Sequence, residues 1–552
     1  MGRSSLPEQQ EDDFLSRGGG HRVDPCDHLL DLLGRAEGQD TQSVLDSLGA
    51  PDLLDLGGLR EKFENCRSAG SSSGIAKGDF NGDGFADLAI GVPGKNIPAT
   101  ELDTGAVIVI YGSATGLTAA GDTNIPASQF WAQNSADVPG ASEEGDRFGS
   151  ALAAGDFNGD GKSDLAVGAP GLQRSNGFPA TLTVQHNAGG VWVLYGQPNN
   201  GLTLANNQLL AQEDSSDSIG TSGSSNAGDL FGASLAAGNF NGDSSGGRPI
   251  SDLAIGVPKE SDFGFLRSIS HAGRVIVLYG VSGTGLAKRS GQSWSQDSDG
   301  IVSEPLAGEK FGFSLAAGDF NGDKKDDLAV GVPGQSLTET VIIASGTPNV
   351  TVSTRNAGAV HIIPGSSSGL TANGSQFWNQ DLVFGSGHGE SDDAFGRALA
   401  AGDFNADGKA DLAIGVPRED VGSVDNAGEV NVIYGSSAGL STTVRTPQIF
   451  RDSTPEAGAE FGRSLTAWNF GRNETHILPP DNFSVTVITA DLAISVPFKD
   501  VNGQKDAGAV TVFYGSSDSN GLTTSSRQIW TEDSPNVPGS AEPGDNFGVA
   551  LY

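Results

Sequence analysis

The stretch DFNGDGFADLAIGVPG, residues 79–94, decides how the rest of this sequence is interpreted. Its first half places oxygen-bearing side chains at loop positions 1, 3, 5 and 9, which are Asp79, Asn81, Asp83 and Asp87. A hard cation such as Ca²⁺ takes about six to eight oxygen ligands, one of which is commonly a backbone carbonyl at position 7, here Phe85. The second half is a short apolar run closed by Gly and Pro. It predicts a buried strand that ends in a turn.

Four phrases recur along the chain, so the stretch is not an isolated turn. The phrase FG-x-x-L-x-A-x-D/N-F begins at Phe148, Phe231, Phe311, Phe395 and Phe461. The DLAIGVP strand returns with small changes at 164–170, 252–258, 327–333, 411–417 and 491–497. A third phrase, which begins with AG and ends with GL, occupies 105–117, 188–202, 272–286, 357–370, 427–440 and 507–522. A fourth, which ends in Asp-Ser or Asn-Ser, occupies 131–135, 294–298, 450–453 and 530–534.

Six copies of one unit predict an all-β repeat architecture. Each unit is expected to hold four strands joined by hairpins, because Gly, Asn and Asp separate its apolar runs. Four-stranded units repeated radially form a β-propeller, here with six or seven blades. A linear solenoid is the alternative, although its repeats are usually shorter. The sequence ends in a further FG phrase at Phe547, so we expect this end to supply a strand to the first blade and cover its open edge.

Composition narrows the class of protein. The 552 residues exceed one ordinary core, and 81 glycines favour a turn-rich β protein. With 32 Lys and Arg against 68 Asp and Glu, the net charge is −36, which argues against direct binding to nucleic acid or to an anionic membrane. Cys26 and Cys66 are either one disulfide or two free thiols. No apolar run reaches the ~20 residues of a membrane helix, and the first residues lack the apolar core of a signal peptide.

Three regions follow from these patterns. Residues 1–24 are polar and glycine-rich and are predicted to be disordered. Residues 25–68 carry leucines at helical spacing, which predicts a short helical appendage. Residues 69–552 hold the repeats and are predicted to form the propeller.

Together, the FG phrase, the metal loop and the GVP phrase resemble FG-GAP repeats, the blades of the integrin α-subunit N-terminal propeller. The resemblance covers roughly residues 70–552. It departs from integrins in showing six copies where they have seven, and in lacking leg domains and a transmembrane helix after the repeats. The resemblance implies a calcium-binding propeller that serves as a protein-binding or cell-adhesion module, placed outside the cell or on its surface.

The metal loop can be carried over to four copies in full, so about four Ca²⁺ ions are expected. The expected ligands are Asp79, Asn81, Asp83, Phe85, Asp87, Asp156, Asn158, Asp160, Lys162, Asp164, Asp319, Asn321, Asp323, Lys325, Asp327, Asp403, Asn405, Asp407, Lys409 and Asp411, with Phe85 and the lysines contributing carbonyls. In the fourth copy Lys324 replaces a turn glycine, which is expected to weaken binding. In the third copy an insertion before Asp252 is expected to displace the ninth-position ligand, and the sixth copy is expected to have lost the site. The alternative is that these loops are Asx-turns without metal.

The sequence leaves three functional classes to compare. If the metal loops share one face, the long loops 171–187, 259–271 and 335–356 and the crossings 213–229 and 381–394 lie on the other, where we expect a protein or glycan ligand. The recurring Trp131, Trp294, Trp378 and Trp530 suggest either blade packing or sugar-stacking platforms of a lectin-like propeller. A polysaccharide lyase or hydrolase is the weakest alternative. No catalytic constellation is found, so no enzyme is predicted.

Overall fold

The computed structural model describes residues 78–551, except 98–101, 114–115, 120, 122–124, 134–137, 139–141, 176–183, 213–225, 265–266, 342–349, 471–473, 479–482, 488, 517–520, 536, 538 and 550. The disordered stretch predicted over 1–24, the helices predicted over 25–68, and Cys26 and Cys66 lie outside the described residues. Within the described part, no helix is long and apolar enough to cross a membrane.

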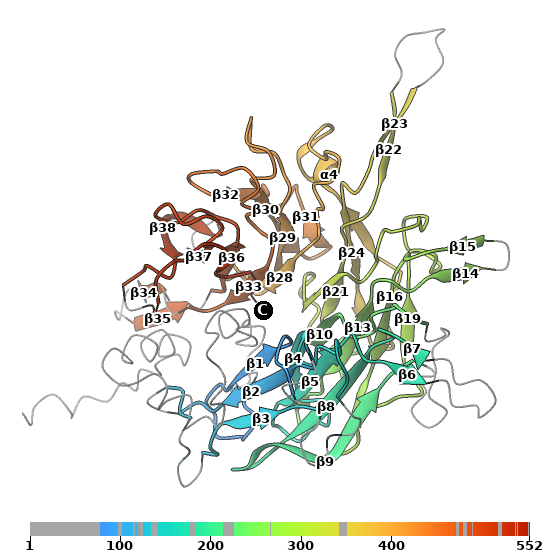
Figure 1. Ribbon diagram of the computed structural model, residues 1–552, viewed down its shortest axis with the longest axis vertical. Coiled ribbons are helices and arrows are strands. Elements are labelled where there is room, and N and C mark those ends of the chain that lie inside the picture. The colour runs from blue at the N-terminus through green and yellow to red at the C-terminus, as the bar shows by residue number, and fades with distance from the viewer. Residues whose placement is uncertain are drawn as a thin grey trace, which may run out of the picture.

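Six antiparallel sheets surround a central axis, near which the C-terminus lies (Figure 1). Blade 1 has three described strands, β1 (Leu88–Val92), β2 (Ala106–Ile110) and β3 (Gln129–Trp131). Blade 2 holds β4 (Ala151–Gly155), β5 (Asp164–Ala169), β8 (Gly190–Gln197) and β9 (Gly201–Leu210). Blade 3 holds β10 (Ser234–Gly238), β13 (Asp252–Val257), β16 (Arg274–Leu278) and β19 (Gln292–Trp294). Blade 4 holds β20 (Ser314–Gly318), β21 (Asp327–Val332), β24 (Ala359–Ile363) and β27 (Gln376–Trp378).

The remaining two blades complete the six. Blade 5 holds β28 (Leu399–Gly402), β29 (Asp411–Val416), β30 (Glu429–Ser436), β31 (Gly439–Ser441) and β32 (Gln448–Arg451). Its fifth strand arises because β30 is long enough to pair with both β31 and β32. Blade 6 holds β33 (Leu465–Trp468), β36 (Asp491–Val496), β37 (Ala509–Tyr514) and β38 (Thr523–Trp530). The predicted all-β propeller is therefore confirmed, with six blades.

The blades also carry short two-stranded ribbons. They are β6 (Arg174–Ser175) with β7 (Val184–Gln185), β11 (Ser244–Ser245) with β12 (Arg248–Pro249), β14 (Asp262–Gly264) with β15 (Arg267–Ile269), β17 (Gly280–Val281) with β18 (Gly285–Leu286), β22 (Leu337–Val341) with β23 (Val350–Thr354), β25 (Gly365–Ser366) with β26 (Gly369–Leu370), and β34 (Glu474–Leu478) with β35 (Phe483–Val487). One short helix, α4 (Gln380–Phe384), lies among the described residues, with Asn379 as its N-cap. The β22–β23 ribbon stands clear of the ring (Figure 1).

The AG phrase of each blade meets the FG phrase that opens the next repeat. Parallel bridges join Gly189 to Phe231 and Gly358 to Phe395, and the same bridge recurs at three other junctions. At Gly358 the backbone has a φ of +89°, and a Cβ there would lie 2.2 Å from the carbonyl oxygen of Phe395. Glycine is thus required both by the left-handed conformation and by the lack of space. These two recurring phrases are the two halves of one contact between blades.

A tyrosine and a glutamine latch neighbouring blades together at their outer strands. The Tyr111 hydroxyl donates to Gln129 Oε1, and the N–H of Leu202 in blade 2 donates to Tyr111 Oη at 3.0 Å. Gln129 Nε2 donates back to the Leu202 carbonyl at 3.0 Å. The glutamine bond to the next blade recurs at Gln208 to Leu286, Gln292 to Leu370, Gln376 to Leu440 and Gln448 to Leu522. The GL glycine makes room for the latch, because a Cβ on Gly201 would lie 1.7 Å from Tyr111 Oη.

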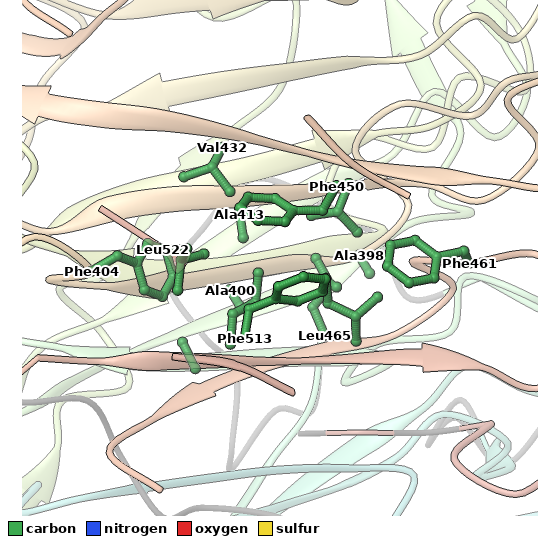
Figure 2. Packing of buried hydrophobic residues seen from close by; sticks show 14 of the residues in the cluster. Ala398, Ala400, Phe404, Ala413, Val432, Phe450, Phe461, Leu465, Phe513 and Leu522 are labelled. Carbon is green, nitrogen blue, oxygen red and sulfur yellow. The ribbon is translucent and has the colours of Figure 1, made fainter. Parts of the chain in front are cut away.

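The core is divided among the junctions between blades. Successive residues of a strand point to opposite faces, so Leu412 and Ile414 of β29 pack toward blade 4 while Ala413 packs toward blade 6. Figure 2 shows the junction of blades 5 and 6, where the rings of Phe450 and Phe513 lie 4.6 Å apart at 56°. Each blade thus buries both faces, as expected for sheets packed around an axis.

The last described residues repeat the FG contact of the earlier junctions. Phe547 bridges Gly508 as the earlier FG phenylalanines bridge their glycines, and the Leu551 N–H donates to Ser464 Oγ at 2.7 Å. Leu551 packs on Val510 and Val512 of blade 6. The described residues contain no pairing of this segment with β1. Its supply of a strand to blade 1 therefore stays a prediction.

Candidate functional site

The candidate metal loops share one end of the ring. In blade 2, β4 ends at Gly155 and pairs antiparallel with β5, which begins at Asp164, so the loop between them is a hairpin turn. Because consecutive strands in every blade are antiparallel, the connections alternate between the two ends of the sheet. The metal loops lie at one end, and the FG phrases with the second-to-third-strand connections lie at the other, called here the FG face.

Asp79 organises the first loop. Its Oδ1 accepts hydrogen bonds from the N–H groups of Gly82 at 2.6 Å and Asp83 at 3.0 Å, and its Oδ2 accepts one from Gly84 at 2.8 Å. Asn81 Oδ1 accepts from the Asp83 N–H at 2.9 Å, and Asp83 Oδ1 accepts from the Phe85 N–H at 2.9 Å. These bonds bring the side chains of positions 1, 3 and 5 around a single turn.

The loops of blades 2, 4 and 5 repeat this geometry. The first-position aspartate accepts from the N–H of position 6 in each: Gly161 to Asp156 at 2.7 Å, Lys324 to Asp319 at 2.7 Å and Gly408 to Asp403 at 2.9 Å. The third-position Asn158, Asn321 and Asn405 each accept from the N–H of position 5. The fifth-position Asp160, Asp323 and Asp407 each accept from the N–H of Lys162, Lys325 and Lys409. Lys324 adopts a φ of +71°, so it preserves the turn that glycine makes elsewhere.

The ninth-position aspartate ties the loop to the body of the blade. Asp87 Oδ2 accepts from the Phe80 N–H at 2.6 Å, and Oδ1 accepts from the Gly112 N–H at 2.8 Å. Equivalent pairs of bonds are made by Asp164, Asp252, Asp327, Asp411 and Asp491. The aspartate keeps these bonds in blades 3 and 6, whose loops depart from the metal pattern. This residue therefore has a structural role that needs no metal.

The third loop departs from the metal pattern at a different position from the one that the insertion suggested. The insertion before Asp252 forms the β11–β12 ribbon beside the loop of blade 2, and Asp252 keeps the same two backbone bonds as its counterparts. What the loop lacks is a carboxylate at position 1, where Asn239 donates its amide to the Asp243 carbonyl at 2.9 Å. In the sixth copy, the ribbon β34–β35 occupies the region between Asn469 and Asp491.

The chemistry of the four intact loops fits a hard cation. Burial raises the pKa of Asp79, and the nearby carboxylate of Asp83 raises it further against the opposing hydrogen bonds of the loop amides. Burial also raises the pKa of Asp87, with added repulsion from Asp79 and Asp83. A divalent cation would neutralise such carboxylates, and three carboxylates, an amide oxygen and a carbonyl form the oxygen-rich set that Ca²⁺ prefers. Across the described residues, no three His, Cys, Asp or Glu side chains converge as a preformed metal cluster.

Three of the loops carry an internal cation. Lys162 Nζ lies 3.1 Å from Asp160, Lys325 Nζ lies 3.3 Å from Asp323 and Lys409 Nζ lies 3.5 Å from Asp407. The lysine stems also pack on the preceding loop, since a Cβ on Gly322 would lie 3.2 Å from Lys409 Cγ. A partly exposed ion pair of this kind contributes little, ~0–1 kcal/mol, so it leaves most of the repulsion among the carboxylates for a metal to relieve.

The recurring tryptophans occupy one position per blade, at the last residue of the outer strands β3, β19, β27 and β38. Trp294 is 9% exposed and belongs to the cluster between blades 3 and 4. Trp131, Trp378 and Trp530 pack against the clusters of their own junctions. These contacts favour blade packing over sugar-stacking platforms.

Buried carboxyl groups at the FG face set an expectation for pH dependence. Burial is the largest cause that raises the pKa of Asp393 from 3.8 to about 7. The charges of Glu390, Asp420 and Glu429 contribute to the increase. Its folded form therefore binds a proton more readily than its unfolded form, and the contribution to stability falls as pH rises from about 4 to 7. We expect Asp393→Asn to stabilise the protein at pH 8 by about 1–2 kcal/mol and by clearly less at pH 4.5. The amide oxygen can still accept the Glu390 N–H.

Thermal unfolding of both forms at the two pH values, in chelator so that no metal titrates, measures this difference. A gain in melting temperature that is equal at pH 8 and pH 4.5 would contradict the assignment to the Asp393 charge.

Sequence reasoning missed a group of cations at the FG face. Lys310 directly precedes Phe311, and Arg397 and Arg463 each follow an FG pair by one residue. The sequence did contain a signal for these cations. The residue directly after FG varies among the copies, whereas the phrase around it does not. Ring closure brings these side chains together, which no single repeat reveals.

Comparison with known proteins supports the repeat assignment. The FG-GAP repeat family model matches residues 72–110, 148–194, 311–363 and 395–433. Human phosphatidylinositol-glycan-specific phospholipase D is 32% identical over 184 residues, covering 33% of this chain and 18% of that protein. Integrin alpha-PS2 of Drosophila melanogaster is 26% identical over 310 residues, covering 56% of this chain and 19% of that protein. The similarity thus spans about a fifth of each relative's own length.

Among solved structures, the exotype rhamnogalacturonan lyase YesX aligns with a TM-score of 0.34 and 13% identity, covering 84% of this chain and 65% of that one. A score this low carries no argument about activity. The repeats, their family match and the six-bladed ring agree with one another. Four segments of this chain match the FG-GAP repeat family, and its propeller is similar to integrin α-subunits.

Proposed function

We propose that this protein is a calcium-stabilised binding module that recognises a protein ligand through its FG face and acts in adhesion at the cell exterior. The observation that carries the proposal is the structural difference between the two ends of the ring. One end holds four nearly identical oxygen-rich loops. The other carries the second-to-third-strand connections, which include the ribbons β6–β7, β14–β15 and β22–β23. These ribbons project from the ring (Figure 1), and binding functions concentrate on such loops.

The expected calcium sites are the reason for placing the protein outside the cell. Calcium sites of extracellular modules bind with dissociation constants of roughly 10⁻⁴–10⁻³ M, so they are filled only where calcium is abundant. A net charge of −36 suits an acidic, soluble surface and disfavours nucleic acid or anionic lipid as the ligand. The absence of an enzymatic activity remains a prediction.

Two serines of blade 4 allow a matched test of the binding face. Ser386 lies in the exposed crossing at the FG face, and Ser368 lies in the exposed β25–β26 turn beside the metal loops. Each is changed to cysteine in a form with Cys26→Ser and Cys66→Ser, and each is then coupled to a bulky polyethylene glycol. We expect modification at Ser386→Cys to reduce binding to intact cells and matrix proteins in calcium, and modification at Ser368→Cys to leave it intact. Equal effects from both positions would overturn the assignment of the face.

A further inference from the structure

The centre of the ring holds a channel whose walls are apolar and whose mouth is cationic. The cavity has a volume of about 540 Å³ and is bounded by the inner strands β4, β10, β20, β28 and β33 together with Val549 and Leu551. Along most of its length the walls are alanine, leucine and serine. The charged residues of the wall are Lys259, Lys310, Arg397 and Arg463. No Asp or Glu lines the described part of this cavity, although the whole chain carries 68 of them.

All four cations lie at the FG face. The inner strand β20 runs from the FG phrase at Phe311 toward the metal loop at Asp319, so Lys310 marks the end of the channel away from the metal loops. Arg397 and Arg463 hold the corresponding positions beside the FG phrases of blades 5 and 6. Lys259 follows the second strand of blade 3, which also ends at this face. The mouth is therefore a local positive site on a strongly negative molecule.

Aromatic rings contact three of these cations. The Arg397 guanidinium carbon lies 5.0 Å from the centre of the Phe313 ring, and Lys310 Nζ lies 5.9 Å from the same ring. The Arg463 guanidinium carbon lies 5.1 Å from the Phe498 ring. Two cations sharing one ring repel each other, and cation–π contacts of ~0.5–2 kcal/mol each offset only part of that cost. Burial lowers the pKa of Lys310, and the charges of Arg397, Lys259 and Arg418 lower it further.

Carboxylate partners are unevenly distributed around the mouth. Glu460 is paired with Arg463 and lies 3.7 Å from Arg418. Within the described residues, Lys259, Lys310 and Arg397 have no carboxylate within ion-pair distance. Lys310 and Arg397 are half-buried and Lys259 is exposed. The charge of Glu460 acts on Arg397 from beyond ion-pair distance. A half-buried cation with no carboxylate in contact favours an incoming anion, because the pair forms where water is partly excluded.

We propose that the mouth of the channel receives the carboxylates of a short acidic segment presented by a protein ligand, with Lys310 and Arg397 as its principal contacts. This inference rests on the proposed function, since it names the chemistry of the ligand at the same face. The guanidinium group matches a carboxylate in geometry and charge, and the ammonium group of lysine matches it in charge. The channel admits a few side chains, and the acidic surface around it repels a long polyanion. A short acidic segment fits both constraints.

The test uses the full calcium-loaded chain and a fluorescent oligoglutamate peptide, with oligoglutamine as its neutral match. We expect oligoglutamate to bind at low ionic strength, to weaken with salt, and to bind about tenfold or more weakly to the Lys310→Gln, Arg397→Gln double variant. The form with Lys310→Gln and Arg397→Lys keeps the charge at position 397, so it should bind oligoglutamate more tightly than the double variant. Lys505→Gln is the matched control for Lys310→Gln alone, because it removes the same single charge from an exposed hairpin of the same face outside the channel.

Several outcomes would overturn the inference: no oligoglutamate binding, equal binding of oligoglutamine, an unchanged affinity in the double variant, or binding of inorganic sulfate alone. If the double variant does not fold, Lys310→Gln alone carries the test. The peptide assay does not depend on knowing the ligand. If a protein ligand binds the FG face and the double variant does not weaken it, only this inference fails. If oligoglutamate binds but no ligand uses that face, the proposed function fails.

Discussion

Replacing Gly358 with alanine is expected to lower the melting temperature several times more than replacing Gly458 with alanine. Both glycines have positive φ, +89° and +76°, so either alanine bears the cost of a left-handed backbone, about 1–2 kcal/mol. Only Gly358 lacks space. A Cβ there would lie 2.2 Å from the Phe395 carbonyl oxygen and 2.4 Å from its nitrogen, whereas nothing lies within 4 Å of a Cβ on Gly458.

The clash at Gly358 cannot be relieved by a side-chain rotation, because the atoms it meets are backbone. The start of blade 5 would have to move away from blade 4, and this would expose part of Phe395, whose side chain is 0% exposed. We expect a total cost on the order of 4 kcal/mol or more, at the extreme of single substitutions. Calorimetric melting of the calcium-saturated variants measures the difference. Equal losses in the two variants would mean that the AG and FG phrases do not hold the blades together.

The parts of the fold that could be predicted from sequence are those whose determinants lie within a single repeat. The FG and AG phrases, the DLAIGVP strand and the metal loop recur because each copy must satisfy the same local backbone requirements. Asp252 shows the limit of this reasoning. The insertion suggested that it was displaced, but a ribbon can leave a hairpin and return without moving the residue that follows.

Contacts between blades were harder to predict, because they join residues that only the closed ring brings together. Gln129 bonds Leu202 across 73 positions of sequence, and the pattern within one repeat gives no partner for either. The recurring glutamine before the outer-strand aromatic was the available signal. The cationic mouth was hidden for the same reason, since Lys310, Arg397 and Arg463 come from three different repeats.

Adding calcium to the metal-stripped protein is expected to produce the largest stabilisation, with a stoichiometry near four. A ligand that binds only the folded state stabilises it by RT ln(1 + [L]/Kd), which is about 1.8 kcal/mol per site when calcium is about twenty times Kd. Four independent sites would then add about 7 kcal/mol. The physical source is the relief of repulsion among the buried carboxylates of Asp79 and Asp87 and the half-buried carboxylate of Asp83, which the loop amides offset only in part.

A pair of matched substitutions separates metal binding from turn geometry. Asp407 and Asp243 both occupy position 5 of their loops, but Asp243 belongs to the third copy, where Asn239 replaces the first carboxylate. We expect Asp407→Asn to remove one calcium from the titration and Asp243→Asn to remove none, because asparagine keeps the acceptor oxygen of the turn and loses only the charge. If the intact protein binds no calcium and its melting is unchanged by chelator, then the amide bonds and the lysine pairs suffice to hold these loops. The loops would then be Asx-turns, and the argument for the cell exterior would lose its physical basis.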